Sequence, residues 1–160
     1  MNHPMSSQRS RTLIIGIGNE YRGDDAAGLV IARGLKRQTI ADVTVLEQSG
    51  EGAALMEAWE GADTVVLIDA VNSGAEAGTI HRIEAHAQPV PQRFFRYSTH
   101  AFSVAEAIEL ARALGELPRR LMVYGIEGKT FKAGNGLSDE VETAVRDVVE
   151  RVIHELARSS

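Results

Sequence analysis

The stretch Thr12–Gly28, TLIIGIGNEYRGDDAAG, decides the fold. It opens with a run of apolar and β-branched residues up to Ile17, which is typical of a strand, and the glycines around its end indicate a turn. From Asp24 onwards, apolar residues recur at the spacing of a helix. The stretch therefore predicts a strand, a glycine turn and a helix. In open α/β sheets, ligands bind beyond the carboxyl ends of the strands, and Asp24 and Asp25 fall at that crevice.

The composition is that of an ordinary globular protein of 160 residues, which is enough for one domain with a sizeable core. The formal net charge is −5 and the basic residues are scattered, which argues against nucleic acid as a partner. The chain has no cysteine, which excludes disulfides, thiolate metal sites and a cysteine nucleophile. No apolar run is long enough to span a bilayer, so we expect no membrane partner.

The chain begins with the polar segment MNHPMSSQRSR, residues 1–11, which has no apolar core of a secretory signal. We interpret this segment as a flexible N-terminal tail and residues 12–158 as a single α/β domain. The sequence predicts a cytoplasmic protein.

Strand patterns alternate with helix patterns along the rest of the chain. The run DTVVLID, Asp63–Asp69, is almost continuously β-branched and apolar, which predicts a strand buried on both faces of a parallel sheet. Thr79–Ile83 alternates apolar and polar residues, as an antiparallel edge strand does. Further strands are predicted at Thr44–Leu46 and Arg120–Ile126, and helices at Asp24–Arg37, Ala53–Trp59, Ala101–Leu114 and from Ser138 to about Ala157. The alternation predicts a three-layer α/β sandwich with a mostly parallel sheet between helices.

Two local predictions concern the segment before the helix at Ala101–Leu114. Ser98 or Thr99 is predicted to be the N-cap of that helix. The aromatic residues Phe94, Phe95 and Tyr97 either form an apolar wall of a peptide groove or cover a face of the sheet.

Three residues capable of metal or acid–base chemistry stand at the ends of separate segments. Asp25 follows the first strand, Asp69 ends the strand DTVVLID, and His100 stands at the expected start of a helix. Because the carboxyl ends of parallel strands share one edge of a sheet, these side chains can converge on one crevice. Two carboxylates and an imidazole suit a divalent transition metal and leave positions open for water or substrate. The plain alternative is that each residue is a cap or a solvated side chain.

Other motifs fit the sequence less well. The glycines of Gly16–Gly18 resemble the start of a dinucleotide fingerprint, but the next glycine, Gly23, lies beyond the required spacing. No P-loop, H-E-x-x-H or G-x-S-x-G motif occurs. Ser98 and Ser103 lie near His100, but no nucleophile elbow surrounds them. A nucleotide-binding α/β domain is therefore the weaker reading.

Four stretches together resemble the hydrogenase maturation endopeptidases. They occur in the family's order and cover nearly the whole chain beyond the tail. They are GIGNEYRGDDAAG at 16–28, VVLIDAV at 65–71, STHAFSV at 98–104 and GLSDEV at 136–141. The resemblance implies a twisted, five-stranded, mostly parallel sheet between helices. It also implies an endopeptidase that removes the C-terminal extension from the large-subunit precursor of a nickel-iron hydrogenase after nickel insertion.

The resemblance also implies roles for particular residues. Members of the family bind a metal with an acid in the first turn, an Asp after the buried strand and a His in the later segment. These positions match Asp25, Asp69 and His100 in this sequence. The first-turn acid is commonly Glu in the family, so Asp25 places its carboxylate about one methylene further back. Many relatives have proline where this chain has Gly128, which affects the loop and not the ligand set.

The mechanism has alternatives at this point. Nickel supplied by the precursor would be a recognition element, or it would also polarise the scissile carbonyl or activate water. Asp24 is a candidate general base. A second class of function is a non-catalytic nickel-binding chaperone or sensor, which would use the same ligands without proteolysis.

Overall fold

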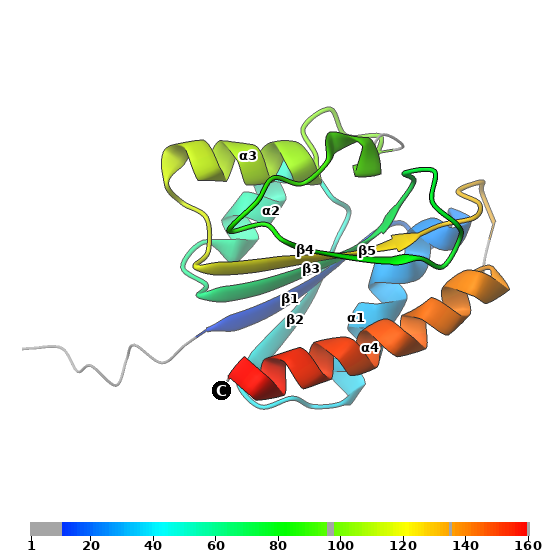
Figure 1. Ribbon diagram of the computed structural model, residues 1–160, viewed down its shortest axis with the longest axis horizontal. Helices are drawn as coiled ribbons and strands as arrows, with labels where there is room; N and C mark the ends of the chain where they lie inside the picture. Colours follow the sequence, from blue (N-terminus) through cyan, green and yellow to red (C-terminus); the bar gives the residue numbers. More distant parts are fainter. Residues whose placement is uncertain (1–10, 96–97, 135, 160) are drawn as a thin grey trace, which may run out of the picture.

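The computed structural model describes residues 11–95, 98–134 and 136–159, and it has a five-stranded sheet between two layers of helices (Figure 1). The strands lie in the order β2-β1-β3-β5-β4. They are β1 (Thr12–Ile17), β2 (Val43–Gln48), β3 (Thr64–Val71), β4 (Ile80–Glu84) and β5 (Arg120–Glu127). All neighbours are parallel except β4, which pairs antiparallel with β5 at one edge. The α/β class, the mostly parallel five-stranded sheet and its flanking helices are confirmed.

Four α-helices cover the two faces of the sheet. Figure 1 shows α2 (Gly52–Trp59) and α3 (Val104–Leu114) on one side, and α1 (Ala27–Arg37) and α4 (Asp139–Ser159) on the other. Two single-turn 3-10 helices, η2 (Gly23–Ala26) and η3 (Gln92–Phe95), lie in the connections. No helix in the described part of the chain is long and apolar enough to cross a membrane.

The core forms two apolar clusters, one on each face of the sheet. All eight residues of β3 are buried, which explains why its sequence is apolar without alternation. Successive side chains of β3 point to opposite faces: Leu67 and Val71 join the cluster under α2 and α3, while Val66 and Ile68 join the one under α1 and α4. Asp69 therefore points to the α2 and α3 face.

The glycine Gly28 explains how the first helix reaches the end of the sheet. A Cβ atom at Gly28 would lie 2.3 Å from the carbonyl oxygens of both Ile17 and Ile68. Only glycine lets the start of α1 press against the ends of β1 and β3 this closely. The same contact brings Asp25, three residues upstream, to the edge where those two strands end.

Two helices start three residues later in the structure than the sequence predicted. The helix expected from Asp24 begins with the 3-10 turn η2, and α1 itself starts at Ala27. The helix expected from Ala101 starts at Val104, because the Glu106 carboxylate accepts hydrogen bonds from the backbone N–H and hydroxyl of Ser103. The prediction of Ser98 or Thr99 as N-cap was wrong. The predicted tail, residues 1–11, lies outside the described residues except for Arg11.

Candidate functional site

A cavity of about 340 Å³ lies where β1, β2 and β3 end. Its lining comes from the turn after β1, from Ser49 and Gly50 after β2, from Asp69 in β3 and from the segment that precedes α3. Asp25, Asp69 and His100 all belong to this lining. Residues that are far apart in the sequence thus meet at one cavity because parallel strands end at the same edge. We call it the strand-end pocket.

Asp25 enters the pocket from the 3-10 turn η2. Its backbone N–H donates to the carbonyl of Arg22 at 3.1 Å, and its side chain is partly buried. A Cβ atom at Gly18 would lie 2.0 Å from the carbonyl oxygen of Asp25, so the turn between β1 and η2 closes only with glycine there. This turn therefore fixes the position of Asp25 relative to the ends of the strands.

Asp69 and His100 reach the pocket from the α2 and α3 side of the sheet. Asp69 is 4% exposed and stands beside Gly125 of β5 in the sheet register. His100 lies three residues before the N-cap of α3, and its backbone N–H donates to the Ser98 hydroxyl at 3.1 Å. The loop before α3 therefore positions the His100 imidazole, whereas the sequence predicted that the start of the helix would do so.

Glu51 contributes a negative charge next to the pocket. It caps α2, and its carboxylate accepts hydrogen bonds from the backbone N–H groups of Ala53 at 3.0 Å and Ala54 at 2.9 Å. These two bonds lower the pKa of Glu51. The acid is thus held ionised beside the imidazole.

The metal-binding prediction for these residues stays a prediction. Within the described residues, no three His, Asp or Glu side chains are gathered closely enough to hold an ion by themselves. Carboxylate oxygens and an imidazole nitrogen are nevertheless suitable donors for nickel, and a pocket supplies the open positions that such chemistry needs.

Asp24, the neighbour of Asp25, has a different role from the general base suggested by the sequence. It is fully buried, and its carboxylate accepts four hydrogen bonds. The donors are the backbone N–H of Lys129 (2.7 Å), of Thr130 (3.1 Å) and of Ser138 (2.8 Å), and the Ser138 hydroxyl (2.9 Å). A carboxylate so fully engaged is a poor acceptor for a proton from water. We call this arrangement the Asp24 clamp, because it ties η2 to the loop before α4.

A second buried carboxylate, Glu127 at the end of β5, was missed by sequence reasoning. It is 1% exposed and accepts from the Ser73 backbone N–H at 2.7 Å, the Ser73 hydroxyl at 2.6 Å and the Gly74 N–H at 3.3 Å. The His81 Nε2 atom lies 3.1 Å from the same carboxylate. Glu127 therefore fixes the turn that follows β3, two residues beyond Val71. Its position at the end of a strand was the one available signal.

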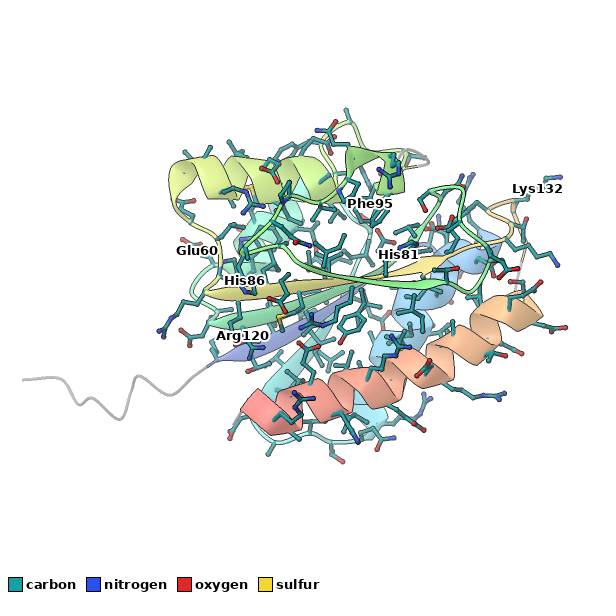
Figure 2. All side chains as sticks on the ribbon, in the orientation of Figure 1. Glu60, His81, His86, Phe95, Arg120 and Lys132 are labelled. Carbon is teal, nitrogen blue, oxygen red and sulfur yellow. The ribbon has the colours of Figure 1, made fainter. Side chains whose placement is uncertain are left out.

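Phe94 and Phe95, two of the aromatic residues before His100, cover a face of the sheet. Phe94 and Phe95 are buried in the core under α2 and α3, and Phe95 also lines the pocket. Figure 2 labels Phe95 and His81, and the His81 ring lies 4.8 Å from that of Phe94, centroid to centroid. Tyr97, the third aromatic of the predicted wall, lies outside the described residues.

Known proteins resemble this chain over most of its length. A family model described as HycI, hydrogenase maturation protease, matches residues 30–155, a range that includes Asp69 and His100. The chain is 28% identical over 153 residues to the hydrogenase 2 maturation protease of Escherichia coli, covering 93% of this chain and 92% of that protein. It is 27% identical over 149 residues to the hydrogenase expression/formation protein HupD of Thiocapsa roseopersicina, covering 91% of this chain and 67% of that protein.

Solved structures resemble the fold as well. The solution structure of an endopeptidase from Escherichia coli superimposes with a TM-score of 0.81 at 27% identity, covering 94% of each chain. The arrangement of sheet and helices is therefore shared with that endopeptidase.

Proposed function

Because the chain belongs to the hydrogenase maturation protease family, we propose that it cuts the C-terminal extension from the large-subunit precursor of a nickel-iron hydrogenase after nickel insertion. The observation that carries this proposal is the convergence of Asp25, Asp69 and His100 on one pocket at the strand ends. The pocket is open to solvent. The fold that forms it is shared by members of a protease family. We place the reaction in the cytoplasm.

Nickel enters this proposal as cargo of the substrate. The precursor brings the ion with its own ligands, and Asp25, Asp69 and His100 supply further donors when the precursor docks. This agrees with a pocket whose described residues do not form a complete metal site. A precursor without nickel lacks the contact and binds more weakly, so cleavage waits for metal insertion.

The reaction is hydrolysis of one peptide bond. Water adds its hydroxyl to the scissile carbonyl carbon, the C–N bond breaks, and the released amine takes up a proton. An ion held at the pocket can polarise that carbonyl or lower the pKa of the attacking water. The buried Asp24 takes no part, because its acceptor positions are used by the loop before α4.

The test is a processing assay with two forms of the same precursor. Purified protein is incubated with nickel-loaded and with nickel-free precursor, and the products are weighed by mass spectrometry. We expect loss of a C-terminal peptide from the loaded form only. Equal cleavage of both forms would reject nickel as the recognition element. Binding of the loaded precursor without any cleavage would instead favour a non-catalytic nickel-binding chaperone or sensor.

A further inference from the structure

We propose that the outer edge of β2 binds the precursor's C-terminal extension as an added antiparallel strand and leads its scissile bond into the strand-end pocket. The proposal rests on the proposed function, and it names how the substrate is held. A sheet edge recognises an extended chain through backbone hydrogen bonds.

The backbone of β2 offers hydrogen-bonding groups on its outer side. The strand pairs with β1 only, and the Gln48 carbonyl accepts from the Gly18 N–H at 3.0 Å on that inner side. Alternate residues of a strand turn their backbone groups to opposite sides, so those of Val43, Val45 and Glu47 point away from β1. Among the described residues no backbone hydrogen bond uses these outer groups.

The side chains of β2 leave this edge unprotected. Native sheets usually guard a free edge with charged residues or a covering turn. The β2 sequence VTVLEQ instead starts with four uncharged residues, and all six residues are partly or fully exposed. Its one charged residue, Glu47, is paired with Arg33 through two hydrogen bonds of 3.0 Å and 2.8 Å. Those bonds hold the pKa of Glu47 low, so its charge stays matched by the guanidinium.

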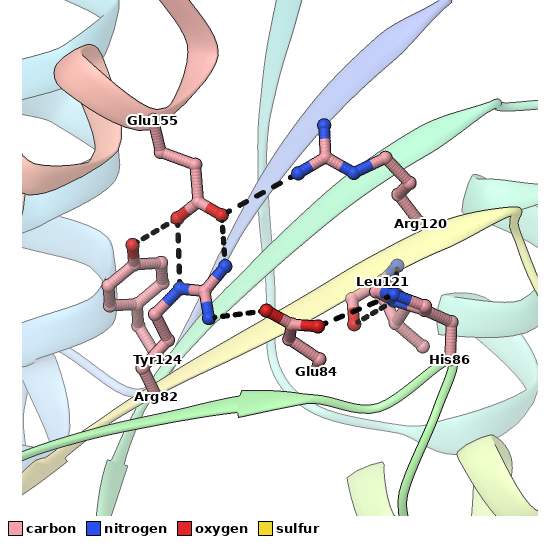
Figure 3. Close-up of polar contacts among 7 residues, drawn as sticks. All are labelled: Arg82, Glu84, His86, Arg120, Leu121, Tyr124 and Glu155. Carbon is pink, nitrogen blue, oxygen red and sulfur yellow. Dashed lines mark hydrogen bonds and ion pairs between the residues drawn. The ribbon is translucent and has the colours of Figure 1, made fainter. Parts of the chain in front are cut away.

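The opposite edge of the sheet, β4, is guarded in the usual way. Arg82 in the middle of β4 donates to Glu84 at 2.9 Å and pairs with Glu155 of α4 (Figure 3). The Glu84 carbonyl accepts from the backbone N–H groups of Ala87 and Gln88, so a turn closes the end of this strand. The contrast between the edges indicates that β2 is left open for a partner.

The position of β2 identifies that partner as the peptide to be cut. The strand runs directly into Ser49 and Gly50, which line the strand-end pocket. A chain that pairs antiparallel with β2 passes from the pocket toward Val43. The nickel-bearing part of the precursor then stays at the pocket, and the extension beyond the scissile bond lies along the edge. β2 has six residues, which at about 3.3 Å per residue gives the extension a track of about 20 Å.

Hydrogen exchange of the whole protein tests the docking directly. The probe is a synthetic peptide with the sequence of the precursor's C-terminal extension, added to the wild-type protein. We expect slower exchange of the backbone amides of Val43, Val45 and Glu47, and unchanged exchange of the amides of β4. Slower exchange that grows with the concentration of the protein alone, without peptide, would show pairing between copies and would overturn the proposal.

A proline substitution removes one outer donor. Val45→Pro deletes an N–H that points away from β1, and an edge strand tolerates proline at such a position. We expect KM for the nickel-loaded precursor to rise about five- to tenfold, as for one lost backbone hydrogen bond, with kcat little changed. Glu84→Pro on the guarded edge is the matched control and should leave KM unchanged.

The outcomes separate this inference from the proposed function. Cleavage by wild-type protein without protection of β2, or an unchanged KM in a folded Val45→Pro variant, would overturn the β2 proposal and leave the protease in place. If Val45→Pro fails to fold, the exchange experiment on wild-type protein decides. Protection of β2 without cleavage would support the docking and reject the protease.

Discussion

Asp24 and Asp25 are neighbours in the sequence and lie in the same 3-10 turn, yet they belong to two different regions of the molecule. Asp24 is fully buried in the Asp24 clamp, where four hydrogen bonds from Lys129, Thr130 and Ser138 engage its carboxylate. Asp25 faces the strand-end pocket with Asp69 and His100. One carboxylate is part of the scaffold, and the other lines the pocket.

The difference shows how burial and hydrogen bonds limit what a carboxylate can do. A buried carboxylate is tolerated when hydrogen bonds replace the water it has lost, and those same bonds leave it little capacity for chemistry. A carboxylate in an open pocket keeps a face for an ion or a substrate. The clamp also serves the pocket, because it holds η2, and with it Asp25, against the loop before α4.

The largest expected effect comes from substitutions in the pocket. Asp25→Asn, Asp69→Asn and His100→Ala should each lower the cleavage rate of nickel-loaded precursor by more than about 100-fold, because even residues that only support a metal ligand contribute 10- to 100-fold. The thermal midpoint should change little for Asp25→Asn. Asp25→Glu is the matched control, since it keeps a carboxylate at this position, and it should retain most of the activity. A processing assay and a melting curve on each variant check these expectations. Normal cleavage by the Asp69→Asn variant would show that Asp69 is not part of the site.

The sequence predicted the sheet from local pattern and placed Asp25, Asp69 and His100 at one edge of it, but it could not predict that Asp24 is buried. The uninterrupted apolar run of β3 and the alternation in β4 are properties of a few neighbouring residues, so pattern alone found them. The burial of Asp24 depends on the N–H groups of Lys129 and Ser138, more than 100 residues later, which no local pattern contains. Ser138 stands just before α4, and its hydroxyl also donates to Asp24.

The second largest effect is expected at Asp24 and concerns stability rather than activity. Asp24→Asn should lower the free energy of unfolding by about 3 kcal/mol, because the new amide N–H₂ faces backbone donors that then lack an acceptor. For a chain of this length that corresponds to a melting temperature lower by about 6–12 °C. The isosteric Asp25→Asn is the control and should unfold near the wild-type temperature. Equal melting temperatures for the two variants would show that the clamp does not stabilise the fold.

A smaller effect is expected at the second buried carboxylate. Glu127→Gln keeps one acceptor oxygen for the backbone N–H groups of Ser73 and Gly74, while the new amide group faces the Ser73 hydroxyl and the His81 ring. We therefore expect a loss of only about 1–2 kcal/mol in urea unfolding, from the weaker neutral hydrogen bonds. Glu127→Ala, which leaves the Ser73 and Gly74 donors without an acceptor, should cost more. A Gln variant as unstable as the Ala variant would show that the charge, and not the shape, holds the turn after β3.

The smallest effect is a loss of stability that occurs only at alkaline pH. It concerns tyrosine, which, like aspartate, occurs in two different environments. Tyr21 is 67% exposed at the rim of the strand-end pocket, whereas Tyr124 is 1% exposed under α4, where its hydroxyl donates to Glu155. Burial and the bond to Glu155 raise the pKa of Tyr124 from 10.0 to about 12. The folded state thus holds the Tyr124 proton more tightly than the unfolded chain does, so stability is unaffected below pH 10 and falls as the pH rises from 10 to 12. Tyr124→Phe should remove this fall and the most alkaline part of the tyrosinate absorbance titration. A wild-type stability that is flat across that interval would mean that the unfolded and folded chains bind the proton equally, and that burial of Tyr124 does not act on its ionisation.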